Sequence, residues 1–200
     1  MQPQEYHFAL YKPFGILSQF SSNDTRQART KKFLGALYEF PEGSMPIGRL
    51  DEKSEGLLLI TTNGKVSNAI NGSGIEKEYF AQLDGEISAE ALKQLDAGVE
   101  IGFEGRKYQT KPCITKRLCE IPQLPEPDRS IRLERHRPSS WISITVTEGK
   151  FRQIRKMTAA VGFPTLRLVR VRIGSISIGH LRKGQVECLP SILSVINEPF

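Results

Sequence analysis

Residues 47–60 read IGRLDEKSEGLLLI, and the rest of the chain can be organised around this stretch. An apolar start, a polar middle and the apolar run 57–60 predict a strand, a tight turn and a second, mostly buried strand. Arg49 and Asp51 share strand parity near the end of the first strand, so both would face the same side. Two interpretations are open at this point: a surface turn with an Arg–Asp ion pair, or a catalytic aspartate beside a basic side chain that faces nucleic acid.

The composition is that of a globular chain of 200 residues, of which 38% are hydrophobic and 25% are charged. This length suits one domain of ordinary size, with enough chain to bury a core and to form two lobes. No apolar run approaches the roughly 18 to 20 residues that span a bilayer, and the N-terminal sequence lacks the basic and apolar regions of a secretory signal. We therefore expect a cytoplasmic protein with no membrane partner.

The cysteines and histidines show no spacing typical of a ligand set. Three cysteines are an odd number without Cys-x-x-Cys spacing, which argues against a disulfide framework or a zinc ribbon and fits a reducing cytosol. The histidines are scattered, with no His-x-x-His or His-Glu-x-x-His grouping, so we expect no metal site. These residues are Cys113, Cys119, Cys188, His7, His136 and His180.

The charge distribution indicates a polyanionic partner. The net charge is +6 and the pI is about 9.3, values that suit a protein that binds nucleic acid. Residues 150–172 contain seven basic side chains and no acidic one. Because a solvated helix face normally mixes both signs, this segment is predicted to be an anion-binding surface.

Local patterns predict an α+β fold in which strands outnumber helices and most connections are hairpin-like. Helices are expected over 65–70, 89–97 and 152–162, with a short basic helix within 26–37; strands are expected over 7–11, 76–83, 141–147 and 185–189, with shorter strands within 99–117 and 166–178. Helix caps at Asn63 and Ser88 and a hairpin turn at 104–105 support these boundaries. The glycine-rich sequence 71–74 predicts a border between two lobes, about 6–70 and about 71–190.

Three motifs in register resemble those of the RsuA/RluA-type pseudouridine synthases: GRLD at 48–51, KEY at 77–79 and GKFRQIRKM at 149–157. The first and third are similar to the RsuA branch, and 140–142 with 157–168 are most similar to its E subfamily of large-subunit rRNA synthases. The resemblance extends from Leu10 to Arg172. It implies the pseudouridine synthase catalytic fold, with a mixed, mostly antiparallel central sheet, a few flanking helices, and two lobes with the active-site cleft between them. Residues 1–200 would form a single catalytic domain without the S4 domain common in that branch.

The resemblance implies that the protein isomerises a uridine of large-subunit (23S) rRNA to pseudouridine. Uracil stays in the site while its bond to ribose changes from nitrogen to carbon, so no cofactor is expected. By motif position Asp51 is the catalytic carboxylate, acting as a nucleophile or as the base for a sugar proton. Arg155 is implied as the counter-charge that orients it, with Arg152 as the second choice. Tyr79 is implied to stack on the extracted uracil.

Basic side chains are expected to hold the RNA. Arg49, beside Asp51, is placed to fill the space that the extracted nucleotide leaves or to bind a flanking phosphate. The other expected RNA-binding residues are Lys150, Arg152, Lys156, Arg167 and Arg170. Lys12-Pro13 is expected to shape the fold rather than to perform chemistry. The implied partner is large-subunit rRNA or an immature ribosomal subunit, bound by a monomer.

Two other functions are open. A non-catalytic rRNA-binding factor for ribosome assembly could have the same fold, although Asp51, Tyr79 and Arg155 are all present. A carboxylate glycosidase needs a second carboxylate about 5 to 9.5 Å from the first. Glu55 is the nearby candidate, but a basic surface would not be needed to bind a neutral sugar.

The chain departs from the branch at two places. Tyr11 precedes Lys12-Pro13 where relatives often have asparagine, and TTNG at 61–64 replaces the usual TNDG. Both positions are expected to affect RNA contacts rather than the chemistry, so they bear on the choice of target.

Overall fold

The computed structural model describes residues 4–131, 133 and 137–193, so His136 lies outside the described residues. The chain divides into two compact units: the first comprises Met1–Ile75 and Arg170–Phe200, and the second comprises Glu76–Val169. The division after Ile75 lies one residue beyond the glycine-rich sequence 71–74. The residues from Arg170 on belong to the first unit, which differs from the expectation that the second lobe extends to about 190.

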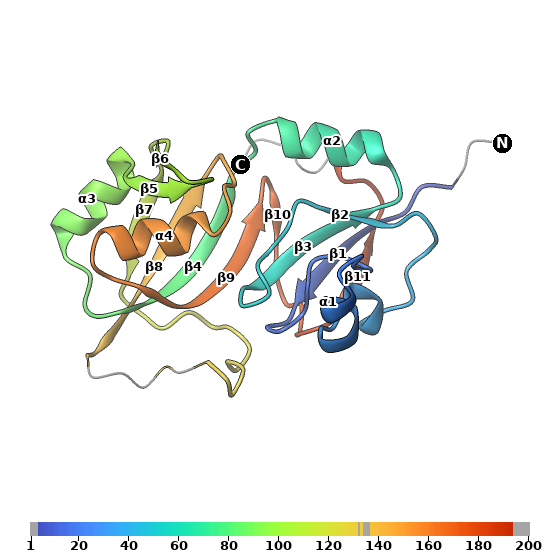
Figure 1. Cartoon of the computed structure of the whole chain (residues 1–200), viewed down its shortest axis with the longest axis horizontal. Coiled ribbons are helices and arrows are strands. Elements are labelled where there is room, and N and C mark those ends of the chain that lie inside the picture. The colour runs from blue at the N-terminus through green and yellow to red at the C-terminus, as the bar shows by residue number, and fades with distance from the viewer. Residues whose placement is uncertain (1–3, 132, 134–136, 194–200) are drawn as a thin grey trace. The chain divides into compact units, whose positions relative to one another are not determined.

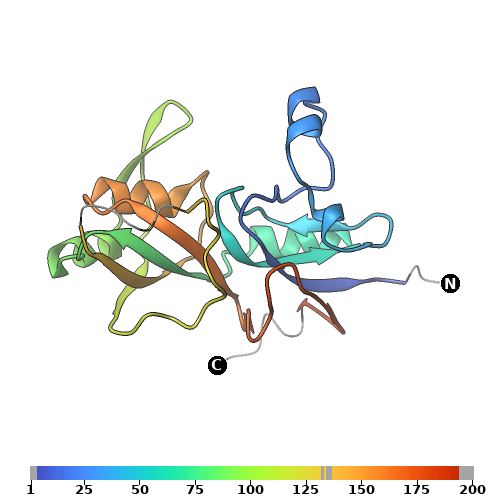
Figure 2. The same ribbon diagram turned by 90° about the horizontal axis from the view of Figure 1, so that it is seen from below.

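The first unit is built on antiparallel strands with β1 (His7–Lys12) at their centre. On one side β1 pairs with β3 (Glu55–Thr61), with Leu10 opposite Leu58, and on the other with β11 (Val186–Leu189), with Phe8 opposite Cys188. The remaining elements are β2 (Met45–Ile47), which pairs with β3, β10 (Ile176–Ser177), which pairs with β9 (Thr165–Ile173), and the helices α1 (Thr25–Thr30), η1 (Leu34–Ala36) and α2 (Gly64–Gly72) (Figure 1). The segment that carries α1 extends away from these strands (Figure 2).

This strand pairing explains why the C-terminal residues join the first unit. The strand β9 begins in the second unit and ends in the first. It turns back at Gly174, which has a φ of +54°, and forms the short ladder with β10. The chain then reaches β1 through β11. The pairing of β11 with β1 is long-range, so no local pattern encodes it.

The core of the first unit follows from the apolar run that was expected to be buried. All seven residues of β3 are buried: strands pair with both of its edges, and its side chains pack against other buried residues and α2. Leu58 and Ile60 of β3 pack with Phe8, Leu10 and other buried residues of one hydrophobic cluster, which also contains Ile16 and Leu34. The helix α2 packs against β2 and β3 and begins after Asn63, whose side-chain oxygen accepts hydrogen bonds from the N–H groups of Lys65 and Val66.

The second unit also contains antiparallel strands. Here β4 (Lys77–Asp84) pairs with β8 (Ser139–Val146), and β8 pairs with β7 (Ile114–Leu118). Two helices belong to this unit, α3 (Ala89–Ala97) and α4 (Gln153–Ala160), and α4 covers one face of the strands (Figure 1). A hairpin of β5 (Glu100–Phe103) and β6 (Arg106–Gln109) projects beyond α4 (Figure 2). The α+β class with a mostly antiparallel sheet is thus confirmed.

One predicted strand is wrong in its extent. The strand β2 ends at Ile47, and residues 48–54 form an irregular turn. Gly48 has a φ of +68°, which a regular strand does not allow. Strand parity therefore does not apply to Arg49 and Asp51: Arg49 is exposed, whereas Asp51 is half-buried.

Candidate active site

Asp51 lies in the turn that joins β2 to β3, and the chain before it is held by one serine. The Ser18 hydroxyl accepts a hydrogen bond from the Leu50 N–H at 3.0 Å and donates one to the Leu50 carbonyl at 2.8 Å. After Asp51 the turn is closed by its own carbonyl, which accepts from the Ser54 N–H at 3.0 Å. Both sides of the aspartate are therefore fixed by hydrogen bonds.

The turn is also held from the segment that follows β1. The Glu52 carbonyl accepts from the Gly15 N–H at 2.8 Å and lies 3.5 Å from the Lys12 ammonium. Lys12 donates to the carbonyls of Pro13 at 2.8 Å and Ile16 at 2.7 Å. Its side chain is fully buried, so the Lys-Pro sequence has a structural role in holding the turn that carries Asp51.

Burial lowers the pKa of Lys12 to about 7, from an ordinary value of 10.5. The carboxylates of Glu55 and Asp51 oppose this shift, and the charge of Arg170 adds to it. A lysine with this pKa is partly neutral near physiological pH. Its hydrogen bonds to carbonyls need only N–H donors, which an amine retains.

Gly56 is the second residue of β3 and lies where another backbone segment approaches closely. Its φ is +106°, and a Cβ atom at this position would lie 2.3 Å from the Arg170 carbonyl oxygen. The Arg170 side chain is buried and its Nε–H donates to the Leu57 carbonyl at 2.7 Å. Arg170 therefore supports β3, which differs from the solvent-facing RNA contact expected from its charge.

In the second unit, Tyr79 lies on β4 opposite Ile144 of β8 and is 9% exposed. Arg155 lies on α4 and is half-buried. Its guanidinium donates to the Thr165 carbonyl at 3.2 Å, while the hydroxyls of Thr158 and Thr165 are 2.7 Å apart. These contacts tie α4 to the start of β9 and limit the positions that the guanidinium can adopt.

Arg167 has a comparable structural contact. It is 4% exposed, and its guanidinium donates to the Pro125 carbonyl at 2.6 Å, holding the proline-rich loop. Arg167 was expected to contact RNA at the surface, but its side chain is buried. Tyr11, expected to affect RNA contacts, is also fully buried.

The other expected basic residues gather at the start of α4. Lys150 and Arg152 precede the helix and Lys156 lies in its first turn. Arg152 has a φ of +53°, a conformation that costs a non-glycine residue roughly 1–2 kcal/mol. Strained backbone of this kind is often retained where function requires it.

Three aromatic rings, which charge patterning alone did not identify, accompany these lysines. The Lys150 ammonium lies 5.2 Å from the centre of the Phe103 ring and 5.0 Å from that of Tyr108. The Lys156 ammonium lies 5.9 Å from the Phe103 ring and 5.5 Å from the Phe151 ring. We call these five residues the cation–aromatic cluster.

A carboxylate fixes the hairpin of this cluster to the start of α4. Glu148 accepts from the Tyr108 hydroxyl at 2.5 Å, the Lys111 N–H at 3.0 Å and the Gln153 amide at 2.7 Å. Burial alone would raise the pKa of Glu148, but these hydrogen bonds and the charge of Lys150 outweigh it and lower the pKa. The hydrogen bond to Glu148 in turn raises the pKa of Tyr108.

The expected site residues are thus distributed over both units. Arg49, Asp51 and Arg170 belong to the first unit, and the second contains Tyr79, Lys150, Arg152, Arg155, Lys156 and Arg167. Within the described ranges, no cluster of three or more His, Cys, Asp or Glu side chains could hold a metal ion. Among the residues that the structure describes, no helix is long and apolar enough to cross a membrane.

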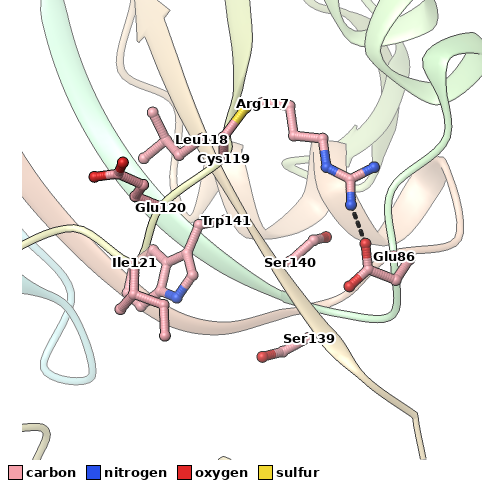
Figure 3. Close-up of a pocket in the computed structure, with 9 residues that line it drawn as sticks. All are labelled: Glu86, Arg117, Leu118, Cys119, Glu120, Ile121, Ser139, Ser140 and Trp141. Carbon is pink, nitrogen blue, oxygen red and sulfur yellow. Dashed lines mark hydrogen bonds and ion pairs between the residues drawn. The ribbon is translucent and has the colours of Figure 1, made fainter.

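A pocket of about 360 Å³ lies beside β7 and β8 of the second unit (Figure 3). Trp141 and Ile121 line one part of it, and the ion pair between Arg117 and Glu86 lies at another. None of the expected catalytic or RNA-binding residues lines this pocket.

Comparison with known proteins assigns the class. The family model described as RNA pseudouridylate synthase matches residues 6–160, so the chain belongs to this family. It is 39% identical to ribosomal large subunit pseudouridine synthase E of Xanthomonas campestris over 178 residues. This alignment covers 88% of this chain and 91% of the relative. The synthase E of Vibrio parahaemolyticus is 36% identical over 87% of this chain and 69% of its own. A solved pseudouridylate synthase superposes with a TM-score of 0.72 at 25% identity, over 93% of this chain and 70% of that one.

Proposed function

We propose that this protein converts a specific uridine of large-subunit rRNA to pseudouridine, with Asp51 as the catalytic carboxylate. Its place in the RNA pseudouridylate synthase family supports the reaction. The names of its relatives, which specify the large ribosomal subunit, support the substrate. We expect a monomer acting in the cytoplasm on rRNA or on an immature subunit.

The observation that carries the assignment of Asp51 is the way in which its turn is built. Ser18 holds the chain before the aspartate, and Gly15 and Lys12 hold the chain after it. An ordinary surface turn needs no buried lysine beneath it, because burial of a charge is costly. A catalytic carboxylate does need a fixed position, since small displacements of a reacting group reduce the rate strongly.

The reaction breaks the bond between C1′ of the ribose and N1 of uracil and forms a bond between C1′ and C5. The hydrogen on C5 is lost and N1 gains one, so the atoms balance without a co-reactant. Asp51 either attacks the sugar or base as a nucleophile or removes a sugar proton. Arg155 supplies the positive charge that orients the carboxylate, and Tyr79 stacks on the uracil once it leaves the RNA helix.

The test uses an rRNA transcript that carries tritium at C5 of its uridines. Each turnover releases this tritium to water, and Asp51→Asn should abolish the release while RNA affinity changes by no more than a few-fold. Glu52→Gln is the matched control, because its carboxylate pairs with Lys31 at 2.9 Å on the surface and its carbonyl is retained. Loss of RNA binding together with activity in Asp51→Asn would indicate a structural role. No release by the native protein from rRNA or immature subunits would favour a non-catalytic assembly factor.

A further inference from the structure

We propose that Phe151, flanked by Lys150 and Lys156, is a stacking platform for an unpaired base of the RNA that is distinct from the target uridine. This inference rests on the proposed function, since it assigns a second contact to the same RNA. It adds an aromatic side chain to a surface for which sequence patterning indicated only basic residues.

The exposure of Phe151 is the first argument. Its side chain is 67% exposed, although it lies directly between Lys150 and Arg152, before α4. Burial of a phenylalanine stabilises a protein relative to exposure, and this ring forgoes most of that gain. An exposed aromatic ring beside cations is the arrangement used by proteins that bind single-stranded nucleic acid, in which bases stack and phosphates are neutralised.

The second argument is that the platform is fixed. The Lys150 N–H donates to the Gln153 side chain at 2.9 Å, and the Gln153 amide donates to Glu148 at 2.7 Å. Phe151 thus lies within a short segment that is anchored on both sides. Because the backbone is held, only the rotamer of the ring has to be ordered when a ligand binds, which favours affinity.

The third argument is the position of the charges. The Lys156 ammonium lies 5.5 Å from the centre of the Phe151 ring and donates to the Gly102 carbonyl at 2.7 Å. An ammonium has three donors, so others remain for a phosphate. The Lys150 ammonium lies 5.2 Å from the centre of the Phe103 ring and 5.0 Å from that of Tyr108. Both cations are therefore next to aromatic faces, as a base with its attached phosphate requires.

RNA suits this surface better than a protein partner or a membrane. Residues 150–172 contain no acidic side chain, whereas the β5–β6 hairpin is balanced, with Glu100 and Glu104 against Arg106 and Lys107. The positive charge of this surface therefore comes from Lys150, Arg152 and Lys156. A protein-binding patch usually buries a connected apolar area, whereas here one ring is surrounded by charges. Base stacking on aromatic rings is tolerant of sequence, so the platform would add affinity without choosing the target.

The experiment compares Phe151→Ala with Phe151→Trp in binding to a 12-nucleotide oligouridine. Loss of one stacked base should weaken binding about 5- to 150-fold in Phe151→Ala, and Phe151→Trp should restore it. The chain has a single tryptophan, Trp141, which is buried, so the native protein provides the background signal. We expect oligouridine to quench the tryptophan fluorescence that Phe151→Trp adds to the native signal. An abasic ribose-phosphate oligomer of equal length should not quench it.

Ile121→Ala is the matched control, because Ile121 is 79% exposed in the same unit and lies outside the cation–aromatic cluster. It should leave affinity unchanged. Equal binding by Phe151→Ala and the native protein, or equal quenching by the abasic oligomer, would overturn the proposal. Neither result depends on turnover, so tritium release by the native protein would still support the proposed function if the platform failed. With the rRNA transcript, Phe151→Ala should raise KM more than it lowers kcat.

Discussion

The close approach of two backbone segments at Gly56 makes Gly56→Ala a demanding test of the first unit. A Cβ atom there would lie 2.3 Å from the carbonyl oxygen and 2.7 Å from the nitrogen of Arg170, whereas ordinary contacts begin at 3.4 Å. Because both neighbours are backbone atoms, β3 or the segment at Arg170 has to move by about 1 Å in a close-packed region.

Three costs follow from this substitution. Overpacking a core costs about 1–3 kcal/mol, and a left-handed φ at an L-residue adds roughly 1–2 kcal/mol. The hydrogen bond from Arg170 to the Leu57 carbonyl, worth about 1.5–3 kcal/mol because the donor is charged, is weakened or lost. Since these terms are coupled, we expect a total loss of about 3–5 kcal/mol. For a chain of this size, Tm should fall by about 6–20 °C.

Urea and thermal unfolding measure this loss, with Gly64→Ala as the control. Gly64 is the first residue of α2, has open space where a Cβ atom would lie, and lacks a positive φ. Alanine there should change the free energy of unfolding by no more than about 1 kcal/mol, in the stabilising direction. If Gly56→Ala unfolded at the same urea concentration as the native protein, the close approach to Arg170 would be refuted.

The remaining predictions concern the support of Asp51. Because burial lowers the pKa of Lys12 to about 7, the unfolded chain binds one more proton between about pH 7 and 10.5, and the native protein should gain about 2 kcal/mol of stability from pH 7 to 9. Lys12→Met should lack this gain; parallel stability–pH profiles for the two proteins, measured by urea unfolding, would contradict the burial of the charge. Ser18→Ala removes both hydrogen bonds to Leu50, so it should cost about 1–3 kcal/mol in stability and lower kcat for tritium release more than it raises KM. Native kcat in Ser18→Ala would mean that the turn does not position Asp51.

Local signals predicted the elements whose ends are set by their own residues. Ser88 caps α3 by accepting from the Ala91 N–H, and the helix ends at Gly98, as its sequence indicates. The hairpin turn at 104–105 is confirmed, since Glu104 and Gly105 both have positive φ values, of +50° and +72°, which a two-residue hairpin loop favours. Such features depend on a few neighbouring residues, and the sequence contains them all.

Features that depend on distant partners were not predictable in the same way. Arg167 and Arg170 look like surface charges in an alternating strand, but tertiary pairing buries both and uses them to hold backbone carbonyls. The extent of the first unit depends on β11 pairing with β1 across most of the chain. Neither fact follows from charge or hydrophobic pattern.

The candidate site also combines features that the local sequence predicts with features that depend on distant residues. Asp51 was identified from its motif, but the roles of Ser18 and Lys12 beneath its turn required the structure. The rings of Phe103 and Tyr108 reach Lys150 through the β5–β6 hairpin, more than 40 residues earlier in the sequence. Phe151 carried a usable signal, since it is an apolar residue within a basic segment.

If Asp51 is the catalytic carboxylate of an rRNA pseudouridine synthase, its removal abolishes the modified nucleotide itself, and mapping of pseudouridines detects that product. Unmodified large-subunit rRNA, free and in immature subunits, would be incubated with the native protein or with Asp51→Asn. We expect one new pseudouridine that appears with the native protein and is absent with the variant. The same site formed by Asp51→Asn, or no site formed by the native protein on either substrate, would contradict it.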